Sequence, residues 1–373
     1  MTIALILIAL LYFLVIGSLI LGFLREKLFV PFNGMDVSFS VIIPFRNEAS
    51  NLPALLESLS ELEYNPSNYE LIFVDDDSED HSVSLINEFR ASNTHLTVSI
   101  LKNLPNTKAP KKTAIELAIR NSKHEWILST DADCQMGPKW LSAYSSFIQQ
   151  EEVDLIAGPV AYTEVSTWLD HFQNFDMMSL QFATIGGFGI GQPFMCNGAN
   201  FAYKKSTFLE LNGFKDNDHI GSGDDVFLLH KAHSKSKAVR YLKSKLAIIW
   251  TKSQPSLHEL FQQRKRWAAK TASYSNSFSK LVAFTVLIMN LGVLVFFAAF
   301  LYGSVSLSML LYFLSLKFLF DLLAVNLASK FFNKPICFQY FILSFIFYPL
   351  FVLLVGISSM ISGYKWKDRS YNQ

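Results

Sequence analysis

Apolar and polar residues divide the chain into three regions. Residues 3–24 are uncharged and almost wholly apolar, and such a run is about long enough for a helix that spans a bilayer. From residue 38 to 250, short apolar or β-branched runs alternate with helix-like stretches. Three more apolar blocks follow at 281–302, 307–327 and 338–361. The pattern predicts a membrane-anchored protein with a water-facing α/β domain between its membrane segments.

The middle region predicts a mostly parallel sheet covered by helices, because strand-like and helix-like stretches alternate as they do in β-α-β units. The expected strands are Ser38–Pro44, Glu70–Asp75, Leu96–Lys102 and Glu125–Thr130. The expected helices are Ala49–Leu62, His81–Arg90 and Lys111–Ser122. Ligands of such sheets bind beyond the carboxyl ends of the strands, so the residues that follow each strand are the first candidates for a site.

The chain is expected to contain five segments. They are a transmembrane anchor at 1–27, the α/β domain at 36–254, an amphipathic interface helix at 255–279, a C-terminal transmembrane region at 280–363 and a tail at 364–373. A cleavable signal peptide is disfavoured because only Met1 and Thr2 precede the first apolar run. The amphipathic stretch is basic and leads into a membrane segment, which favours a position in the bilayer interface.

Charges beside the apolar blocks give a conflicting topology. By the positive-inside rule, the central domain is expected on the cytoplasmic side, given the basic residues at Arg25, Lys27, Lys280, Lys330 and Lys334. Three C-terminal spans would then place Lys365, Lys367 and Arg369 outside, against the same rule. Either one apolar block is re-entrant or interfacial, or the tail breaks the rule.

Composition supports the membrane prediction and excludes other classes. Hydrophobic residues make up 51% of the chain, with 34 Phe, while charged residues make up 17%. That exceeds the need of one soluble core. The formal net charge of +1 argues against a nucleic-acid binder. The cysteines Cys134, Cys196 and Cys337 form no CxxC pair, so they indicate neither a disulfide framework nor a zinc site.

Two acidic motifs directly follow expected strands. Asp131 and Asp133 stand two residues apart, and oxygen ligands of this kind suit Mg²⁺ or Mn²⁺, with a substrate phosphate in the same shell. Asp75, Asp76 and Asp77 are adjacent acids that repel one another. A protein is expected to keep three such residues together when they accept hydrogen bonds from a ligand. Alternatively, the first motif is a solvated loop and the second an acidic turn that caps a helix.

Two further motifs have competing interpretations. Asp224 and Asp225 precede a predicted helix, so they either cap it or include a general base, because repulsion between adjacent carboxylates helps one accept a proton. Gln263, Arg266 and Trp267 form either an interfacial belt or a site for a diphosphate and a sugar ring.

Other charged residues of the chain are less specific. Lys111 or Lys112 opens a helix and either reaches a phosphate or is solvated. We interpret His230 and His233 as a solvated helix face. In the 307–327 block, Lys317 and Asp321 have i, i+4 spacing, which allows an ion pair with either a functional or a structural role.

In this order, the motifs resemble those of the membrane-bound inverting glycosyltransferases of family 2, in the branch of ceramide glucosyltransferase and the cellulose and hyaluronan synthases. The resemblance covers about residues 38–275 and implies a GT-A-type nucleotide-sugar-binding domain. It implies donor contacts from Pro44, Arg46, Glu48, Asp75, Asp76, Asp77, Lys111 and Asp131. It also implies a metal at Asp133 and Asp131, an acceptor-side loop with Asn197, Gly198 and Asn200, and a QxxRW motif at Gln263, Arg266 and Trp267.

Within the resemblance, Asp225 corresponds to the catalytic base, and Asp224 stands where the family has Glu. The implied enzyme is an integral membrane glycosyltransferase with a cytoplasmic catalytic domain. It would move a sugar from a UDP- or GDP-linked donor to a lipid or glycan acceptor, with Mg²⁺ or Mn²⁺ and without nucleic acid. The alternatives are a processive polysaccharide synthase, for which the C-terminal membrane region is short, and a non-catalytic membrane subunit that retains the nucleotide-sugar pocket.

Overall fold

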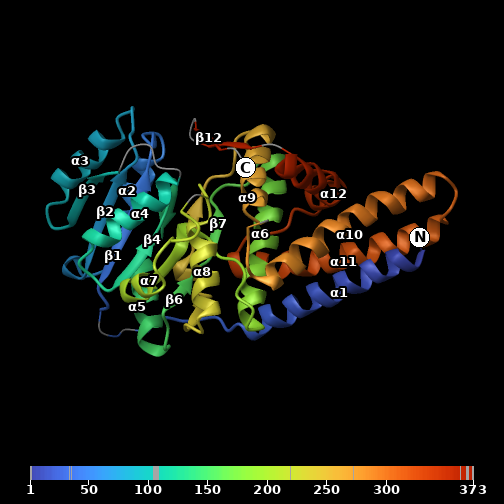
Figure 1. The fold of residues 1–373 in the computed structure, drawn as a ribbon, viewed down its shortest axis with the longest axis horizontal. Coiled ribbons are helices and arrows are strands. Elements are labelled where there is room, and N and C mark those ends of the chain that lie inside the picture. Colours follow the sequence, from blue (N-terminus) through green and yellow to red (C-terminus); the bar gives the residue numbers. More distant parts are fainter. Residues whose placement is uncertain are drawn as a thin grey trace. The chain divides into compact units, whose positions relative to one another are not determined.

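The computed structural model describes residues 2–32, 34, 36–103, 109–218, 220–271, 273–361, 363–366 and 369–371, so Lys367 of the basic tail lies outside the described residues. The chain forms two compact units. The first, here the α/β unit, contains Lys27–Thr163 and Pro193–Lys252. The second, the helical unit, contains Met1–Glu26, Glu164–Gln192 and Ser253–Gln373. Figure 1 draws the elements of both units.

The α/β unit is built on a seven-stranded sheet with the order β3-β2-β1-β4-β8-β6-β9. Its strands are β1 (Phe39–Phe45), β2 (Tyr69–Asp75), β3 (Thr97–Lys102), β4 (Trp126–Ser129), β6 (Leu155–Ala157), β8 (Phe201–Lys204) and β9 (Val239–Tyr241). β1 pairs in parallel with β2 and β4, and β2 with β3. β8 runs antiparallel to both of its neighbours. The predicted mostly parallel sheet is therefore confirmed.

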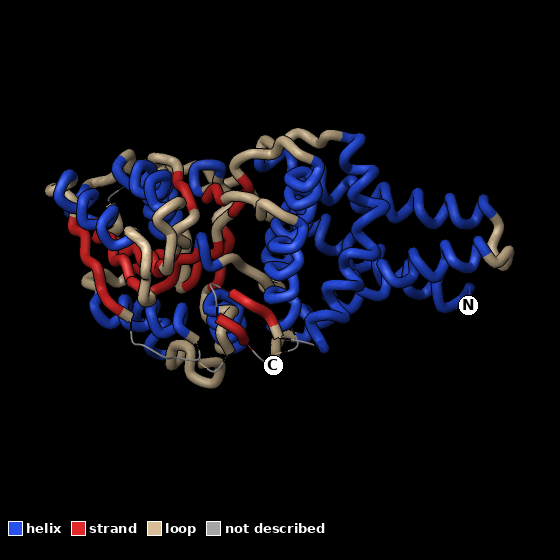
Figure 2. Tube along the Cα trace, turned by 90° about the horizontal axis from the view of Figure 1, so that it is seen from above, coloured by secondary structure: helices blue, strands red, loops and turns tan. Residues whose placement is uncertain are grey.

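Helices cover both faces of this sheet, as Figure 2 shows. Phe39, Val41 and Ile43 of β1 are fully buried in a core with α2, α3 and α5. Ile42 points to the other face, where α4 contacts β1 and β2. The strands read as continuous apolar runs because both faces are covered. The helices are α2 (Leu52–Ser60), α3 (Ser82–Ser92), α4 (Pro110–Asn121), α5 (Trp140–Gln150), α7 (Lys205–Glu210) and α8 (Asp224–Ser234).

A second, three-stranded sheet and three short 3-10 helices complete the α/β unit. The sheet has the order β5-β10-β7, with β5 at Cys134–Met136, β7 at Val160–Tyr162 and β10 at Ile249–Thr251. The 3-10 helices are η1 (Pro66–Asn68), η2 (Gly198–Asn200) and η3 (Lys245–Ala247). The hydrophobic pattern did not predict these elements, because runs of three residues are too short to show a period.

The helical unit contains α1 (Thr2–Arg25), α6 (Trp168–Gly189), α9 (Leu257–Thr271), α10 (Ser277–Leu301), α11 (Leu307–Phe332) and α12 (Phe338–Ile361). Within the described residues, α1, α10, α11 and α12 are long and apolar enough to cross a membrane. These four helices coincide with the four predicted apolar blocks. Two strands, β11 (Tyr364–Trp366) and β12 (Arg369–Tyr371), form an antiparallel pair after α12.

Helix α6 joins the helical unit, although the sequence places it inside the 36–254 segment. It contacts α1, α11 and α12. At its crossing with α1 the backbones touch, since a Cβ added to Gly22 would lie 2.0 Å from the Gly186 carbonyl oxygen. A Cβ on Gly189 would meet the Gly22 oxygen at the same distance. Small residues allow such close helix packing.

Candidate active site at the carboxyl ends of the strands

The loops after β1 and β2 are fastened to each other by hydrogen bonds. Arg46 donates to the carbonyl oxygens of Asp76 and Asp77, each over 2.8 Å. The Ala49 backbone N–H donates to Asp80 Oδ2 over 2.9 Å. Burial raises the pKa of Asp80, but hydrogen bonds from Ser82 and Ala49 lower it by more, so the pKa lies below its usual value. Arg46, predicted as a donor contact, therefore also fixes the shape of this loop pair.

The three acids after β2 differ in their surroundings. Asp75 accepts a hydrogen bond from the Ser78 backbone N–H over 2.9 Å. Asp76 is buried and accepts one from Asn103 Nδ2 over 2.8 Å. Asp77 is exposed, with φ at +67°, a conformation that is uncommon for a residue other than glycine. The exposed carboxylate lies 3.8 Å from Arg46. Asp77 thus presents its side chain to solvent, while Asp75 and Asp76 hold the loop.

Pro44 and Glu48 flank Arg46 in structurally defined positions. Pro44 lies within β1, in register with Val74 of β2. Glu48 is buried, its side chain accepts a hydrogen bond from Asn51 Nδ2 over 2.8 Å, and its backbone N–H donates to the Ser82 hydroxyl oxygen over 2.9 Å. Both residues therefore shape the strand end where a ligand is expected.

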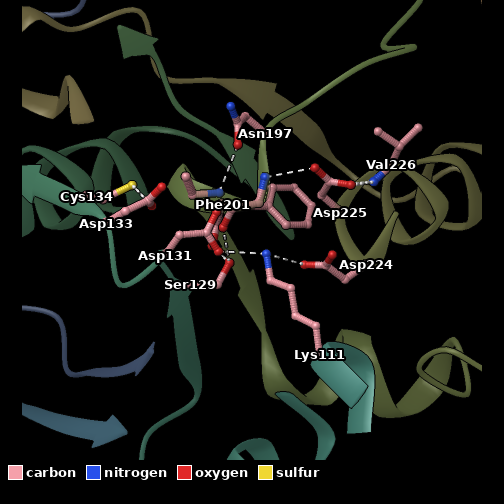
Figure 3. Close-up of polar contacts among 12 residues, drawn as sticks. Lys111, Ser129, Asp131, Asp133, Cys134, Asn197, Phe201, Asp224, Asp225 and Val226 are labelled. Carbon is pink, nitrogen blue, oxygen red and sulfur yellow. Dashed lines mark hydrogen bonds and ion pairs between the residues drawn. The ribbon is translucent and has the colours of Figure 1, made fainter. Parts of the chain in front are cut away.

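Lys111 joins two of the predicted acidic motifs (Figure 3). Its Nζ lies 2.7 Å from Asp131 Oδ1, after β4, and 3.4 Å from Asp224 Oδ2, at the start of α8. Burial lowers the pKa of Lys111, but the carboxylates of Asp131 and Asp224 raise it by more, so the ammonium stays charged. The structure therefore brings together residues separated by more than a hundred positions in the sequence.

Asp225 is held against the 197–200 loop. Its Oδ2 accepts a hydrogen bond from the Gly198 backbone N–H over 2.9 Å, and its Oδ1 accepts one from Val226 N–H over 2.7 Å. A Cβ on Gly198 would lie 3.0 Å from Asp224 Oδ2. Glycine at position 198 therefore allows the 197–200 loop to approach both carboxylates. Gly223, with φ at +82°, precedes α8 and directs Asp224 and Asp225 toward this loop.

Asn200 lies beneath this loop and is fully buried. Its Oδ1 accepts hydrogen bonds from Trp140 Nε1 over 3.1 Å and Tyr144 OH over 2.8 Å. Its Nδ2 donates to the carbonyl oxygens of Pro159 and Ala247 over 2.8 and 2.7 Å. With its amide used in this way, Asn200 supports the loop from the interior and does not face solvent.

Asn197 differs from Asn200, because its side chain is half-buried and caps η2 through the Ala199 N–H over 3.0 Å. The same loop is tied to the end of β4, where the Ser129 hydroxyl donates to the Gly198 and Phe201 carbonyl oxygens. Of the predicted acceptor-side residues, Asn197 is therefore half-buried, while Gly198 is buried against Asp225.

Asp131 and Asp133 supply carboxylate oxygens, which are ligands that Mg²⁺ and Mn²⁺ prefer. Both are partly exposed and close a turn in which Cys134 N–H donates to the Asp131 carbonyl oxygen over 3.2 Å. Cys134 Sγ lies 3.6 Å from Asp133 Oδ1. No group of three or more His, Cys, Asp or Glu side chains among the described residues is placed to hold a metal. The protein would thus supply two carboxylates, and Mg²⁺ commonly completes such a shell with water and phosphate.

Lys112 and His230 differ from their sequence interpretations. Lys112 is buried, donates to the Asn217 carbonyl oxygen over 2.6 Å and lies 5.0 Å from the Phe227 ring centroid. His230 is also buried, with Nε2 2.9 Å from the Phe194 carbonyl oxygen. The predicted solvated face is therefore wrong for His230. Helix α8 turns this face inward, so that His230 packs against the segment that carries Phe194.

The QxxRW residues Gln263, Arg266 and Trp267 lie on α9 of the helical unit. Arg264, which the sequence analysis did not select, is buried there and donates from Nε to Asp176 Oδ2 over 2.6 Å. It also donates to Gln263 Oε1, and its guanidinium carbon lies 4.2 Å from the Trp267 ring centroid. Arg264 thus orders two residues of the motif. Arg264 differs from the other basic residues of α9 because it is buried, and the sequence alone does not show which basic residue of an amphipathic helix is buried.

Two family models match the chain. The model described as "Glycosyl transferase family 2" matches residues 40–211, and the one described as "Glycosyl transferase family group 2" matches residues 126–357. The second match covers more than half of the chain and includes the Asp131, Asp225 and QxxRW motifs.

Named relatives and one solved structure give a consistent result. Glycosyltransferase AglE of Haloferax volcanii is 26% identical over 195 residues, which cover 52% of this chain and 60% of the relative. Poly-beta-1,6-N-acetyl-D-glucosamine synthase of Staphylococcus aureus is 23% identical over 268 residues, which cover 68% and 61%. The chain therefore matches about three fifths of the length of these relatives.

The mannosyltransferase PcManGT from Pyrobaculum calidifontis, solved with GDP-Man and Mn²⁺, is similar in fold. It superposes with a TM-score of 0.60 at 17% identity and covers 92% of this chain and 98% of its own. The likeness in fold confirms the predicted GT-A-type α/β class with flanking apolar helices.

Proposed function

The chain belongs to glycosyl transferase family group 2, and from this membership we propose that it moves a sugar from a nucleotide-diphosphate sugar to a hydroxyl group of a lipid or glycan acceptor. The observation that carries the proposal is the cluster formed by Lys111 with Asp131 and Asp224 next to Asp225. A cation among carboxylates at the ends of parallel strands is a site for an anionic ligand and its counter-ion.

On the donor side, the loop pair after β1 and β2 would hold the nucleoside. Asp77 is the exposed acid of that pair, and Arg46 keeps its loop in shape. Lys111 would contact a phosphate of the donor, since its ammonium is charged and stands beside the metal-binding pair Asp131 and Asp133. The nucleotide of the donor is UDP or GDP in this proposal; the solved mannosyltransferase contains GDP-Man.

On the acceptor side, Asp225 would take the proton of the attacking hydroxyl. Hydrogen bonds from Gly198 and Val226 fix the direction of the carboxylate, which favours a defined position of the acceptor oxygen. The hydroxyl oxygen would form a bond to the anomeric carbon as the bond to the diphosphate oxygen breaks. One displacement of this kind inverts the anomeric centre, so an α-linked donor would give a β-linked product.

A divalent cation, Mg²⁺ or Mn²⁺, would be held by Asp133 and Asp131. When bound, it would supply positive charge for the departing diphosphate. The residues of the chain itself would then position the phosphates through Lys111 and exclude a second orientation of the donor. The QxxRW residues Gln263, Arg266 and Trp267 are proposed, from the resemblance alone, to bind the leaving group and the sugar.

The α/β unit is proposed to face the cytoplasm, where nucleotide sugars are found, and the acceptor to come from the bilayer. The apolar helices α1, α10 and α11 and the basic helix α9 support a membrane-presented acceptor. A processive synthase is the alternative within the same class, and the likeness to poly-beta-1,6-N-acetyl-D-glucosamine synthase supports including it. The length of the product, measured by mass, separates the two.

The test is donor consumption by the purified full-length protein in detergent or nanodiscs, with a panel of UDP- and GDP-sugars and Mg²⁺ or Mn²⁺. We expect one donor to be consumed, a chelator to stop this, and the metal to restore it. Asp225→Asn should reduce turnover by about a thousandfold or more, as expected for loss of a general base and its positioned contact, and should leave nucleotide binding unchanged.

Asp216→Asn is the matched control, because it makes the same chemical change on an exposed residue of the loop before α8. Full turnover in Asp225→Asn would refute the assigned base. Tight nucleotide binding with no consumption of any donor by the unmodified protein would instead favour a non-catalytic subunit.

A further inference from the structure

Helix α12 (Phe338–Ile361) contains no Asp, Glu, Lys or Arg and is long enough to cross a bilayer. Its position can be judged from the elements of the helical unit that it contacts. Helix α9 precedes α10, α10 crosses away from the α9 side, and α11 returns. Helix α12 follows α11 after only five residues, 333–337. It therefore begins on the side of the membrane where α9 lies.

The first turns of α12 cross α11 and do not run along it. The rings of Phe338, Phe341 and Phe345 lie 6.0, 5.3 and 5.2 Å from the ring of Phe318. Seven residues of helix advance about 10 Å, yet all three rings contact one residue of α11. Phe345 also lies 4.9 Å from the neighbouring Lys317 Nζ. Two helices packed side by side would change partners with each turn.

The middle of α12 packs on α6, and its later turns contact α10, where a Cβ on Gly356 would lie 3.4 Å from Leu287 Cδ1. Tyr348 OH donates to Asp176 Oδ1 over 3.2 Å, and the rings of Phe351 and Phe172 lie 5.1 Å apart. Helix α6 enters and leaves the helical unit at Glu164 and Gln192, both times next to the α/β unit in the chain. The middle of α12 therefore packs on a helix whose two ends are both connected, along the chain, to the α/β unit.

The far end of α12 returns to α9. Phe261 of α9 lines one pocket with Leu354, Ile357 and Ile361 of α12. Strand β11 begins three residues after α12 ends and also contacts α9. The chain thus enters α12 from the α9 side and leaves it on the same side. Figure 1 agrees, since α1, α10 and α11 extend together while α12 remains at the end of that bundle beside α6 and α9.

We propose that α12 does not cross the membrane but lies within the leaflet on the α9 side. In this position it covers α6 and α9 and exposes its other face to lipid. Its partner is the acyl-chain region of that leaflet. The C-terminal strands β11 and β12 then lie on the same side as α9 and as the α/β unit that precedes it in the chain.

The exposed face of α12 fits this partner. One face packs on protein, and exposed apolar residues follow the helix at three- and four-residue spacing: first Leu343, Ile346 and Leu350, then Leu354, Ile357 and Ile361 in the open groove beside Phe261 of α9. A helix at the water interface would carry a polar face, and α12 has none. The position also removes the topological conflict, because Lys365 and Arg369 then follow the positive-inside rule together with Lys280.

Sidedness of labelling tests the proposal without reference to catalysis. Single cysteines are introduced by Gln373→Cys in the tail, Ser304→Cys in the α10–α11 loop and Ser92→Cys in the α/β unit, each in a Cys337→Ser background. The remaining native cysteines, Cys134 and Cys196, are buried. A membrane-impermeant maleimide is applied to sealed right-side-out and inverted vesicles, and the variant without an added cysteine gives the background.

We expect Gln373→Cys to be labelled in the same vesicles as Ser92→Cys and to be protected where Ser304→Cys is labelled. Labelling of Gln373→Cys together with Ser304→Cys would overturn the proposal, because α12 would then cross the bilayer. A protease-cleavable epitope tag placed after Gln373 reads the same sidedness if the cysteine is shielded.

Discussion

Replacing Asn200 by alanine separates a supporting role from direct contact with an acceptor. The sequence resemblance assigns this residue to the acceptor-side loop, whereas the structure buries it completely. Its amide joins α5, through Trp140 and Tyr144, to the carbonyl oxygens of Pro159 and Ala247. Asn200→Ala therefore removes a connection between three segments of the α/β unit, although the Pro159 carbonyl oxygen still accepts a hydrogen bond from the Ile249 N–H.

The magnitude follows from the four lost hydrogen bonds. A buried donor or acceptor left unsatisfied costs about 1–3 kcal/mol, and Tyr144 keeps a weaker partner in the Asn200 main-chain oxygen at 3.4 Å. Because neighbouring losses are not additive, we expect Asn200→Ala to destabilise the α/β unit by about 3–5 kcal/mol. For a domain of this size that lowers the melting temperature by about 6–20 °C.

The assay is thermal unfolding followed by circular dichroism in detergent, with donor consumption measured on the same sample below the transition. Asn197→Ala is the control, since this half-buried neighbour makes a single capping bond and should cost about 1 kcal/mol. An Asn200→Ala protein with an unchanged melting temperature but no transfer would refute the reasoning and return Asn200 to the acceptor site.

Two further substitutions test contacts of charged side chains. Lys111→Met should lower kcat/KM for the donor about 10–100-fold, because a charge-assisted contact to phosphate is worth about 1.5–3 kcal/mol. Lys111→Arg keeps the positive charge and should retain part of the activity. Unchanged steady-state kinetics in Lys111→Met would contradict the donor role. Arg264→Lys should destabilise the helical unit by about 1–3 kcal/mol. Lysine cannot donate to both Asp176 and Gln263 and at the same time lie over the Trp267 ring as the guanidinium does. A melting temperature equal to that of the control variant Gln262→Ala would argue against this.

The sheet and the apolar helices could be predicted because their sequences carry strong local signals. The strand expected at Glu70–Asp75 is β2 at Tyr69–Asp75, and the block at 281–302 is α10. Each of these elements is apolar along its whole length because the whole element is shielded from water, whichever residues it packs against. The DxD and Asp224-Asp225 motifs were also found, because acidic residues that follow apolar runs stand out.

Features that depend on distant contacts could not be predicted. The sequence shows Lys111 as one of two adjacent lysines, and only the fold turns Lys111 toward Asp131 and Lys112 toward Asn217. Helix α6 gave no clear signal because it buries polar residues such as Asn174 and Asp176 beside apolar ones. The partner of Asp176, Arg264, is 88 residues away.

The contact of α1 with α6 has a consequence for protein engineering. Gly22 and Gly186 meet backbone to backbone, with no space for even one methyl group. A transmembrane segment of equal length and hydropathy from another protein would lack the glycine that allows this close contact with α6. Exchanging α1 for such a segment should therefore keep the chain in the membrane yet disturb α6, so the N-terminal helix is a fitted part of the enzyme and not an interchangeable tether.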